Sequence, residues 1–220
     1  EKDGVLVSGG ANGNIVYSEN KGAFWSTFET KTGSSHAGHY HNALASPDGF
    51  IVIGVGCGAG QTPETSIALS EDGKNWDQWT VDGRCIGSMS YGNGIYVGMG
   101  RSTYNPDTDL IYWDCATSTD LVTWTPCTQL FDTWEGLSVW GAGARHYGFL
   151  NGEFLYSERG SGSIGSRSID GLNWDYFDWG TVYPPDNLIY EQGQYLGFGW
   201  TTPVGEWNYA CYRFSGDDIE

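Results

Sequence analysis

Ser70-Glu71-Asp72-Gly73-Lys74-Asn75-Trp76 is the stretch that decides the fold of this 220-residue chain, because the chain repeats it. Copies with the same end residues and a variable middle run from Ser18 to Trp25, from Ser118 to Trp124 and from Ser168 to Trp174, and a broken copy begins at Ser215. A short polar side chain that folds back on the backbone, with Gly or Asn at positive φ, is typical of a tight turn. We therefore predict that each copy is a structural turn, after which Trp begins an apolar strand.

A second marker precedes each Ser-to-Trp turn: an Asp-Gly or Asn-Gly step, or Gln-Gly in the last copy, followed by a run rich in strand-forming residues. These steps begin at Asp3, Asp48, Asn93, Asn151 and Gln192, with spacings of 45, 45, 58 and 41 residues. Asp-Gly and Asn-Gly between apolar runs are the strongest short hairpin signals. A repeat of this length with four short strands per unit is typical of a β-propeller blade.

The predicted fold is therefore all-β, a five-bladed β-propeller in one domain of residues 1–220. Its units span about residues 1–35, 36–82, 83–133, 134–180 and 181–220. No segment keeps the 3.6-residue apolar period of a helix. The first unit lacks its first strand and the last unit lacks its fourth, so we expect the terminal strands to close the ring and remove the exposed sheet edges.

The charge balance restricts the possible partners. Ten Lys and Arg residues stand against 27 Asp and Glu residues, and the formal net charge is −17. Such a field repels polyanions, so we expect no nucleic-acid partner. The chain has no apolar run near the ~18 residues of a membrane span and no start that resembles a signal peptide, so membrane insertion is not expected.

Five cysteines are too few for a disulfide scaffold. Cys115 and Cys127 each lie three residues outside the turn that runs from Ser118 to Trp124, which would place them opposite each other on a hairpin and allow a disulfide. Cys57 and Cys85 fall in loops at the same end of adjacent blades and form a second expected pair, which leaves Cys211 free. The alternative is five reduced thiols, as in a cytosolic protein.

The Ser-to-Trp turns resemble the Asp-box, or bacterial neuraminidase repeat, family of β-propellers, whose pattern is roughly Ser-x-Asp-x-Gly-x-x-Trp. The resemblance covers nearly the whole chain through four turns. The copy at Ser18 keeps the full spacing with Asn20 in place of Asp, the copies at Ser70 and Ser168 are one residue shorter, and the copy at Ser118 has no Gly. Such short versions are similar to propeller domains of bacteriophage tail and other virion proteins.

In that family these turns lie on the outer side of the blades, away from the ligand. The resemblance therefore implies structural roles for Asp72, Asp120 and Asp170. Ligand-binding residues are expected at the opposite end of the blades, where the connecting loops vary in length.

Arg101, Arg159 and Trp200 align just past the second strand of their units. Arginines there could bind a carboxylate or phosphate, and aromatic rings could stack on sugars. The alternatives are that the arginines neutralise nearby acids and that the aromatics only cover strands. The predicted ligand-binding residues are Arg101, Arg159, Trp200, Trp134, Tyr183, His39 and Tyr104, with no catalytic residue among them.

Neither metal-like segment of the sequence matches a known site. His36, His39 and His41 have no second cluster to complete four zinc ligands. The acidic segment from Asn105 to Asp109 lacks the spacing and terminal Glu of a calcium loop. We therefore expect no metal and no cofactor.

Two main classes of function compete. The sequence favours a non-catalytic module that recognises cell-surface carbohydrate or a receptor, in a secreted or phage-tail protein, and disfavours an enzyme. It would act outside the cell or on a virion surface, as part of a larger, trimeric assembly. The alternatives are a sialidase-like glycoside hydrolase and a structural or subunit-docking propeller. Sialidase-like catalysis, as the resemblance implies it, needs a six-bladed ring, three arginines and a Tyr nucleophile with a Glu partner, and five short units leave no room for a sixth blade.

Overall fold

The computed structural model describes residues 1–10, 13–29, 40–56, 64–100, 103–105, 110–112, 115–127, 144–158, 164–179, 185–201 and 208–215. This part of the chain consists of strands and connecting turns without a helix, as the absence of helical periodicity predicts. It therefore also contains no helix long and apolar enough to cross a membrane.

Five antiparallel sheets of three or four strands follow one another along the described chain. The first contains β1 (Leu6–Gly9), β2 (Asn14–Ser18) and β3 (Ser26–Glu29), and the second contains β4 (Tyr40–Ser46), β5 (Gly49–Gly56), β6 (Glu64–Ser70) and β7 (Asp77–Asp82). The third contains β8 (Ile86–Gly92), β9 (Ile95–Gly100), β12 (Cys115–Ser118) and β13 (Thr125–Pro126), with the ribbon β10 (Thr103–Asn105) and β11 (Leu110–Tyr112) inserted. The fourth contains β14 (Ala144–Leu150), β15 (Glu153–Glu158), β16 (Ile164–Ser168) and β17 (Asp175–Asp178), and the fifth contains β18 (Asn187–Glu191), β19 (Gln194–Thr201) and β20 (Asn208–Ser215).

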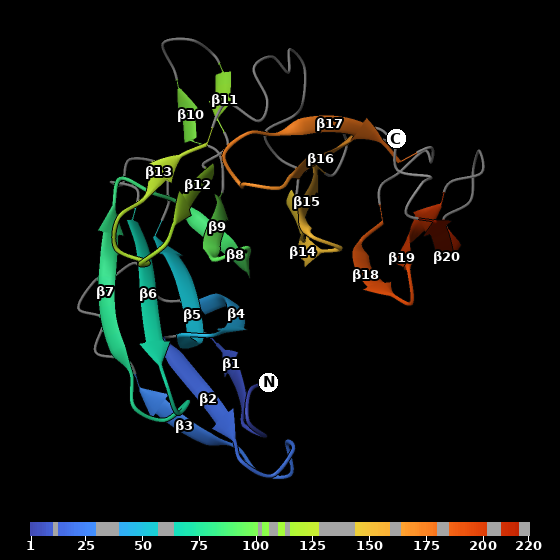
Figure 1. The fold of residues 1–220 in the computed structure, drawn as a ribbon. Helices are drawn as coiled ribbons and strands as arrows, with labels where there is room; N and C mark the ends of the chain where they lie inside the picture. Colours follow the sequence, from blue (N-terminus) through green and yellow to red (C-terminus); the bar gives the residue numbers. More distant parts are fainter. Residues whose placement is uncertain are drawn as a thin grey trace.

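The sheets stand around a common axis like blades, but they form an open arc (Figure 1). Strands β4, β8, β14 and β18 are innermost, and each contacts the next along the arc. The predicted ring closure is wrong, because the first and fifth sheets remain separate three-stranded sheets. Lys2 pairs with Val5 across the turn at Asp3-Gly4 rather than with the fifth sheet.

Each Ser-to-Trp turn is held by the same hydrogen bonds. In the second sheet the hydroxyl of Ser70 donates to Asp72 Oδ1 (3.0 Å) and accepts the N–H of Gly73 (2.8 Å). The backbone N–H groups of Lys74 and Asn75 donate to the same carboxylate oxygen, each at 2.8 Å. The equivalent side chain in each of the other turns also accepts a backbone N–H, through a carboxylate oxygen of Asp120 or Asp170 or through the amide oxygen of Asn20. The side chain at this position therefore holds its own turn together.

These hydrogen bonds stabilise the ionised carboxylates. Backbone N–H groups, chiefly that of Thr123, lower the pKa of Asp120 to about 2, and those of Asn173 do the same for Asp170. The N–H groups of Asn75 and Lys74 hold the pKa of Asp72 well below its usual range. All three side chains are therefore ionised at neutral pH.

We expect acid to weaken the fold through these turns. The folded pKa values lie below the value of about 3.9 for an unfolded Asp, so the carboxylates stabilise the fold fully above about pH 4 and lose that contribution as the pH falls towards 2. The urea concentration at the midpoint of unfolding, measured from pH 5 to pH 2, should decrease between about pH 4 and pH 2. The Asp170→Asn variant should show a smaller fall, and an equal fall would contradict the assignment.

Apolar side chains fill every junction between neighbouring sheets. At the first junction Ile15 and Phe28 of the first sheet pack with Val52 and Trp76 of the second. Buried residues at the next three junctions are Ile51, Ile67, Ile86 and Tyr96, then Val97, Cys115, Phe154 and Tyr156, and then Leu155, Phe177, Leu188 and Tyr195. The core is thus a series of four interfaces between sheets.

The Trp that ends each turn packs across these junctions. Trp76, Trp124 and Trp174 lie partly buried in the first, second and third junctions, against clusters built from their own sheet and the preceding one. Trp25 belongs to the first sheet, which has no described sheet before it, and its side chain is 47% exposed.

The predicted disulfide between Cys115 and Cys127 is confirmed. It bridges β12 and the residue after β13, with the two Cα atoms 5.4 Å apart. Cys85 is also disulfide-bonded, and its predicted partner, Cys57, lies outside the described residues. Cys211 is free and exposed. The alternative of five reduced thiols is wrong.

Candidate functional site

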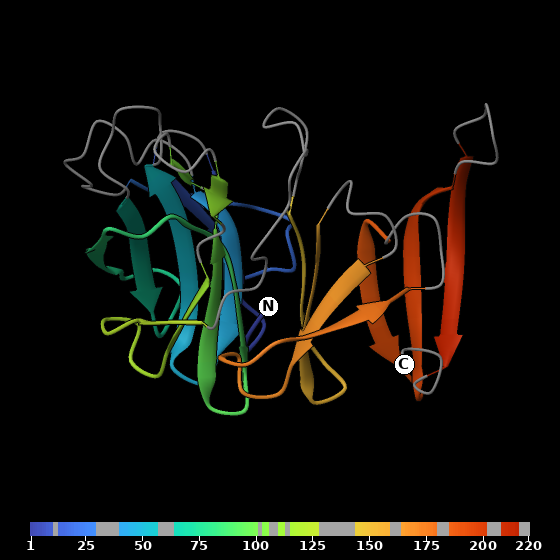
Figure 2. The same cartoon turned by 90° about the horizontal axis from the view of Figure 1, so that it is seen from above.

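The strand order gives the arc two different ends. In a four-stranded sheet such as β4-β5-β6-β7, the first and third connections lie at one end and the second connection lies at the other. We call the end with the Asn-Gly-type and Ser-to-Trp turns the turn face, and the opposite end the loop face. Figure 2 shows the turns that join β8 to β9 and β14 to β15 at the same end of the arc.

Most of the predicted ligand-binding residues lie outside the described part of the chain. These are Arg101, Arg159, Trp134, Tyr183 and His39. For the other two only the backbone is described. Trp200 pairs with Tyr209 near the loop-face end of β19, and Tyr104 pairs with Ile111 in the ribbon between β9 and β12. Their roles remain predictions.

The loop face also carries acidic residues that the sequence analysis did not single out. Asp186 directly precedes β18, the innermost strand of the fifth sheet; its N–H donates to the carbonyl of Phe198 (2.7 Å), and its side chain is half-buried. Glu158 ends β15 and pairs with Ala144, the first residue of β14. Since β14 contacts β18, these two residues lie on adjacent sheets. The sequence signal for these residues was weak, an acidic residue at the loop-face end of a strand without distinctive spacing.

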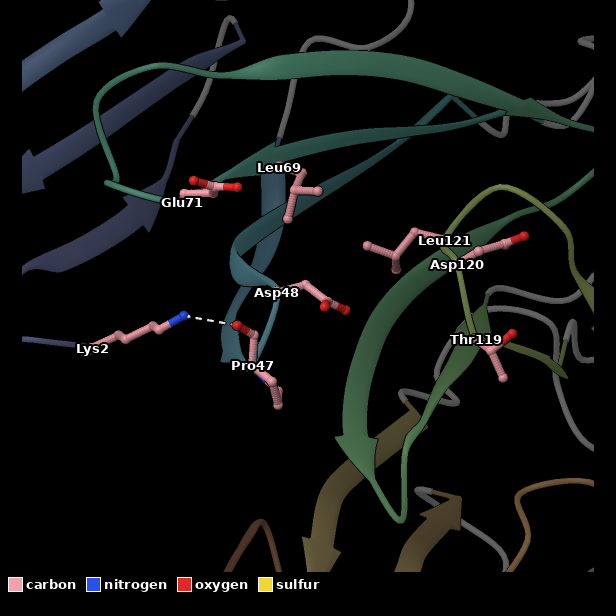
Figure 3. A pocket seen from close by; sticks show the side chains of 8 residues that line it. All are labelled: Lys2, Pro47, Asp48, Leu69, Glu71, Thr119, Asp120 and Leu121. Atoms are coloured by element: carbon pink, nitrogen blue, oxygen red, sulfur yellow. Dashed lines mark hydrogen bonds between the residues drawn. The ribbon is translucent and has the colours of Figure 1, made fainter.

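A cavity of about 670 Å³ opens on the turn face (Figure 3). It lies where the turns of the second and third sheets meet the N-terminal segment. The residues that line it are Lys2, Pro47, Asp48, Leu69, Glu71, Thr119, Asp120 and Leu121.

Two of its three carboxylates are already engaged. Asp48 accepts a hydrogen bond from the hydroxyl of Tyr96 (2.5 Å), which also bonds to Ser46 Oγ (2.9 Å). Burial, with the bond to Asp48, raises the pKa of Tyr96, so this tyrosine stays protonated and is a poor nucleophile. Asp120 is held ionised by its own turn. Only Glu71 would remain to move a proton, and most glycoside hydrolases use two carboxyl groups.

The described residues contain no group of three or more His, Cys, Asp or Glu side chains that could hold a metal ion. His36 and His39 lie outside the described residues, and of the segment from Asn105 to Asp109 only Asn105 is described. The expectation of no metal therefore stays a prediction.

Comparison with known proteins places the fold. No family model and no curated protein matches the sequence. Solved structures of the GH93 α-L-arabinofuranosidase of Fusarium graminearum do match. One of them, an E242A mutant with an iminosugar inhibitor, matches at a TM-score of 0.55 and 15% identity, and the alignment covers 98% of this chain and 73% of that chain. The other, with arabinobiose, matches at TM-score 0.55 and 14% identity over 98% and 72% of the two chains. At such low identity the likeness shows a shared fold, that of β-propeller glycoside hydrolases.

This comparison corrects the function expected from the sequence. The prediction of a non-catalytic recognition module, and with it the preference against an enzyme, is wrong, because the solved structures that share the fold are glycoside hydrolases. The finding favours the alternative of a glycoside hydrolase. The arc of five sheets aligns over 98% of its own length with such an enzyme and covers 73% of that enzyme's chain.

Proposed function

We propose that this protein is a glycoside hydrolase of the sialidase-like β-propeller type, with Asp-box-like turns and an active site on the loop face. The observation that carries the proposal is the fold shared with an arabinofuranosidase over 98% of this chain. The turn face is a poor alternative because two of the three carboxylates of its cavity already accept hydrogen bonds, Asp48 from Tyr96 and Asp120 from its own turn. The proposed substrate is a glycan outside the cell.

Most glycoside hydrolases use two carboxyl groups on either side of the scissile bond, about 5–5.5 Å apart for retention and about 6.5–9.5 Å apart for inversion. We propose Asp186 and Glu158 for this pair. Asp186 directly precedes β18, the innermost strand of its sheet, and Glu158 ends β15, the second strand of the adjacent sheet, so both lie at the loop face on the rigid strand scaffold.

The substrate would be held by the loop-face residues that the sequence predicts. Guanidinium groups can pair with a sugar carboxylate, and aromatic rings can stack on the C–H face of a sugar ring. The proposed binding residues are Arg101, Arg159, Trp200, Trp134, Tyr183, His39 and Tyr104.

The experiment is an activity screen with a panel of 4-methylumbelliferyl glycosides that includes the α-L-arabinofuranoside and the sialoside, followed by polysaccharides with analysis of released sugars. Hydrolysis of at least one substrate is expected. If folded protein releases no sugar from any of them, the proposal fails.

On the substrate so identified, Asp186→Asn is expected to lower kcat at least about 100-fold, because positioned acid–base groups contribute about 10²–10⁴-fold. The matched control is Asp178→Asn, an exposed carboxylate on the same face at the end of the outermost strand, β17. It should retain near-normal kcat. Equal effects of the two substitutions, with unchanged melting temperatures, would exclude Asp186 from catalysis.

A further inference from the structure

The backbone at Asp186 is restrained from three sides. Its N–H donates to the carbonyl of Phe198 on β19 (2.7 Å). Pro185, directly before it, is buried, and the proline ring fixes its own φ. Asn187 pairs with Phe198, so Gly199 lies opposite Asp186, one residue beyond the last residue pair of β18 and β19. These restraints determine where the side chain of Asp186 leaves the backbone.

Gly199 is buried and has no room for a side chain. A Cβ atom at this position would meet the amide nitrogen of Asp186 at 2.9 Å and the Cα atom of Pro185 at 3.0 Å. Both are backbone atoms, so a side chain at Gly199 could be accommodated only by moving the chain that carries Asp186. The glycine therefore allows β19 to approach Pro185 and Asp186 this closely.

The third sheet has a similar contact, and there it has a structural purpose. A Cβ atom at Gly100, the last residue of β9, would overlap the carbonyl of Cys85, which directly precedes β8. Cys85 is 1% exposed and disulfide-bonded, so the contact there holds a cross-link. Asp186 precedes β18 as Cys85 precedes β8, but it is half-buried, and one oxygen of its carboxylate, Oδ2, is buried. In the fifth sheet the close contact thus holds an acid at the loop face.

We propose that Gly199 is a positioning residue for the carboxylate of Asp186. The inference rests on the proposed function, in which Asp186 is one of the two carboxyl groups that act on the glycosidic bond. Such groups must be held close to their productive geometry, and a misplacement of about 1 Å can cost about 10²-fold in rate. Gly199 meets this requirement by bringing β19 against the backbone of Asp186, and it acts through that backbone.

The test is a double-mutant cycle on the substrate that the activity screen identifies. Gly199→Ala is expected to lower kcat at least about ten-fold with little change in KM, because it moves the acid and leaves the binding residues in place. In the Asp186→Asn background the same substitution should have no further effect on kcat, since the group that it misplaces is already gone. Additive losses in the double variant would overturn the positioning role.

The matched control is Gly87→Ala, near the loop-face start of β8. A Cβ atom there would meet only Val55 Cγ1, at 4.0 Å, so kcat should stay normal. Thermal melts establish that each variant is folded. If Gly199→Ala does not fold, Pro185→Gly, which loosens the same backbone from the other side, replaces it in the cycle with the same direction of effect expected.

The outcomes separate this inference from the proposed function. Folded protein without glycosidase activity would overturn both together. Activity that is lost in Asp186→Asn but retained in Gly199→Ala would overturn the positioning role alone.

Discussion

Trp174→Ala is expected to lower the free energy of unfolding by about 3 kcal/mol, the lower end of the range for Trp-to-Ala changes because the ring is partly buried. Its ring lies in the third junction with Val97 and Phe154, and its indole N–H donates to the carbonyl of Gly171 (3.0 Å). The substitution therefore removes both contact between two sheets and a bond that closes the turn. Urea unfolding followed by circular dichroism measures the effect.

Trp25 provides a matched control for the Trp174→Ala measurement. Trp25 occupies the same position in its turn, but its side chain is 47% exposed and no described sheet precedes it. Trp25→Ala is expected to change the free energy of unfolding by no more than about 0.5 kcal/mol. Equal losses for Trp25→Ala and Trp174→Ala would show that the turn, rather than the junction, is what these tryptophans stabilise.

Leu121→Ala is expected to cost about 2–5 kcal/mol, the usual range for a buried leucine. Leu121 is only 2% exposed and packs in the second junction with Ile51 and Ile67. The indoles of Trp79 and Trp124 both donate to its carbonyl, each at 3.1 Å, so the backbone there is held on two sides.

Leu121 adopts a left-handed conformation, with φ of 63°, at the position where the neighbouring turn has Gly171 with φ of 69°. A left-handed non-glycine residue costs about 1–2 kcal/mol. Leu121→Gly removes the same packing but relieves that strain, so it should be about 1 kcal/mol more stable than Leu121→Ala in urea unfolding. The opposite order would mean that the left-handed backbone is not strained.

Local features of the fold could be predicted from the sequence. Asn93 and Asn151 adopt the positive φ that their Asn-Gly steps predict, and Cys115 bonds to Cys127 as the hairpin symmetry allows. Each of these outcomes depends on a few neighbouring residues and on backbone sterics. A single sequence contains that information directly.

Contacts between distant segments could not be predicted in the same way. The packing of Trp76 in the junction between the first two sheets and the failure of the terminal sheets to pair depend on how whole sheets are placed, which turn chemistry does not determine. Asp186 was missed because one acidic residue after two prolines has no distinctive spacing. The choice between binding and catalysis required the fold comparison.

The open arc has a consequence for cooperativity. Every interior sheet gains stability from two neighbours, whereas the first and fifth sheets each have one described neighbour. In such a quasi-one-dimensional array, stability is a sum of local and nearest-neighbour terms, so the ends open before the middle. The third sheet, cross-linked at Cys115 and Cys127 and flanked on both sides, is then the most persistent unit, and unfolding proceeds inward from the two termini.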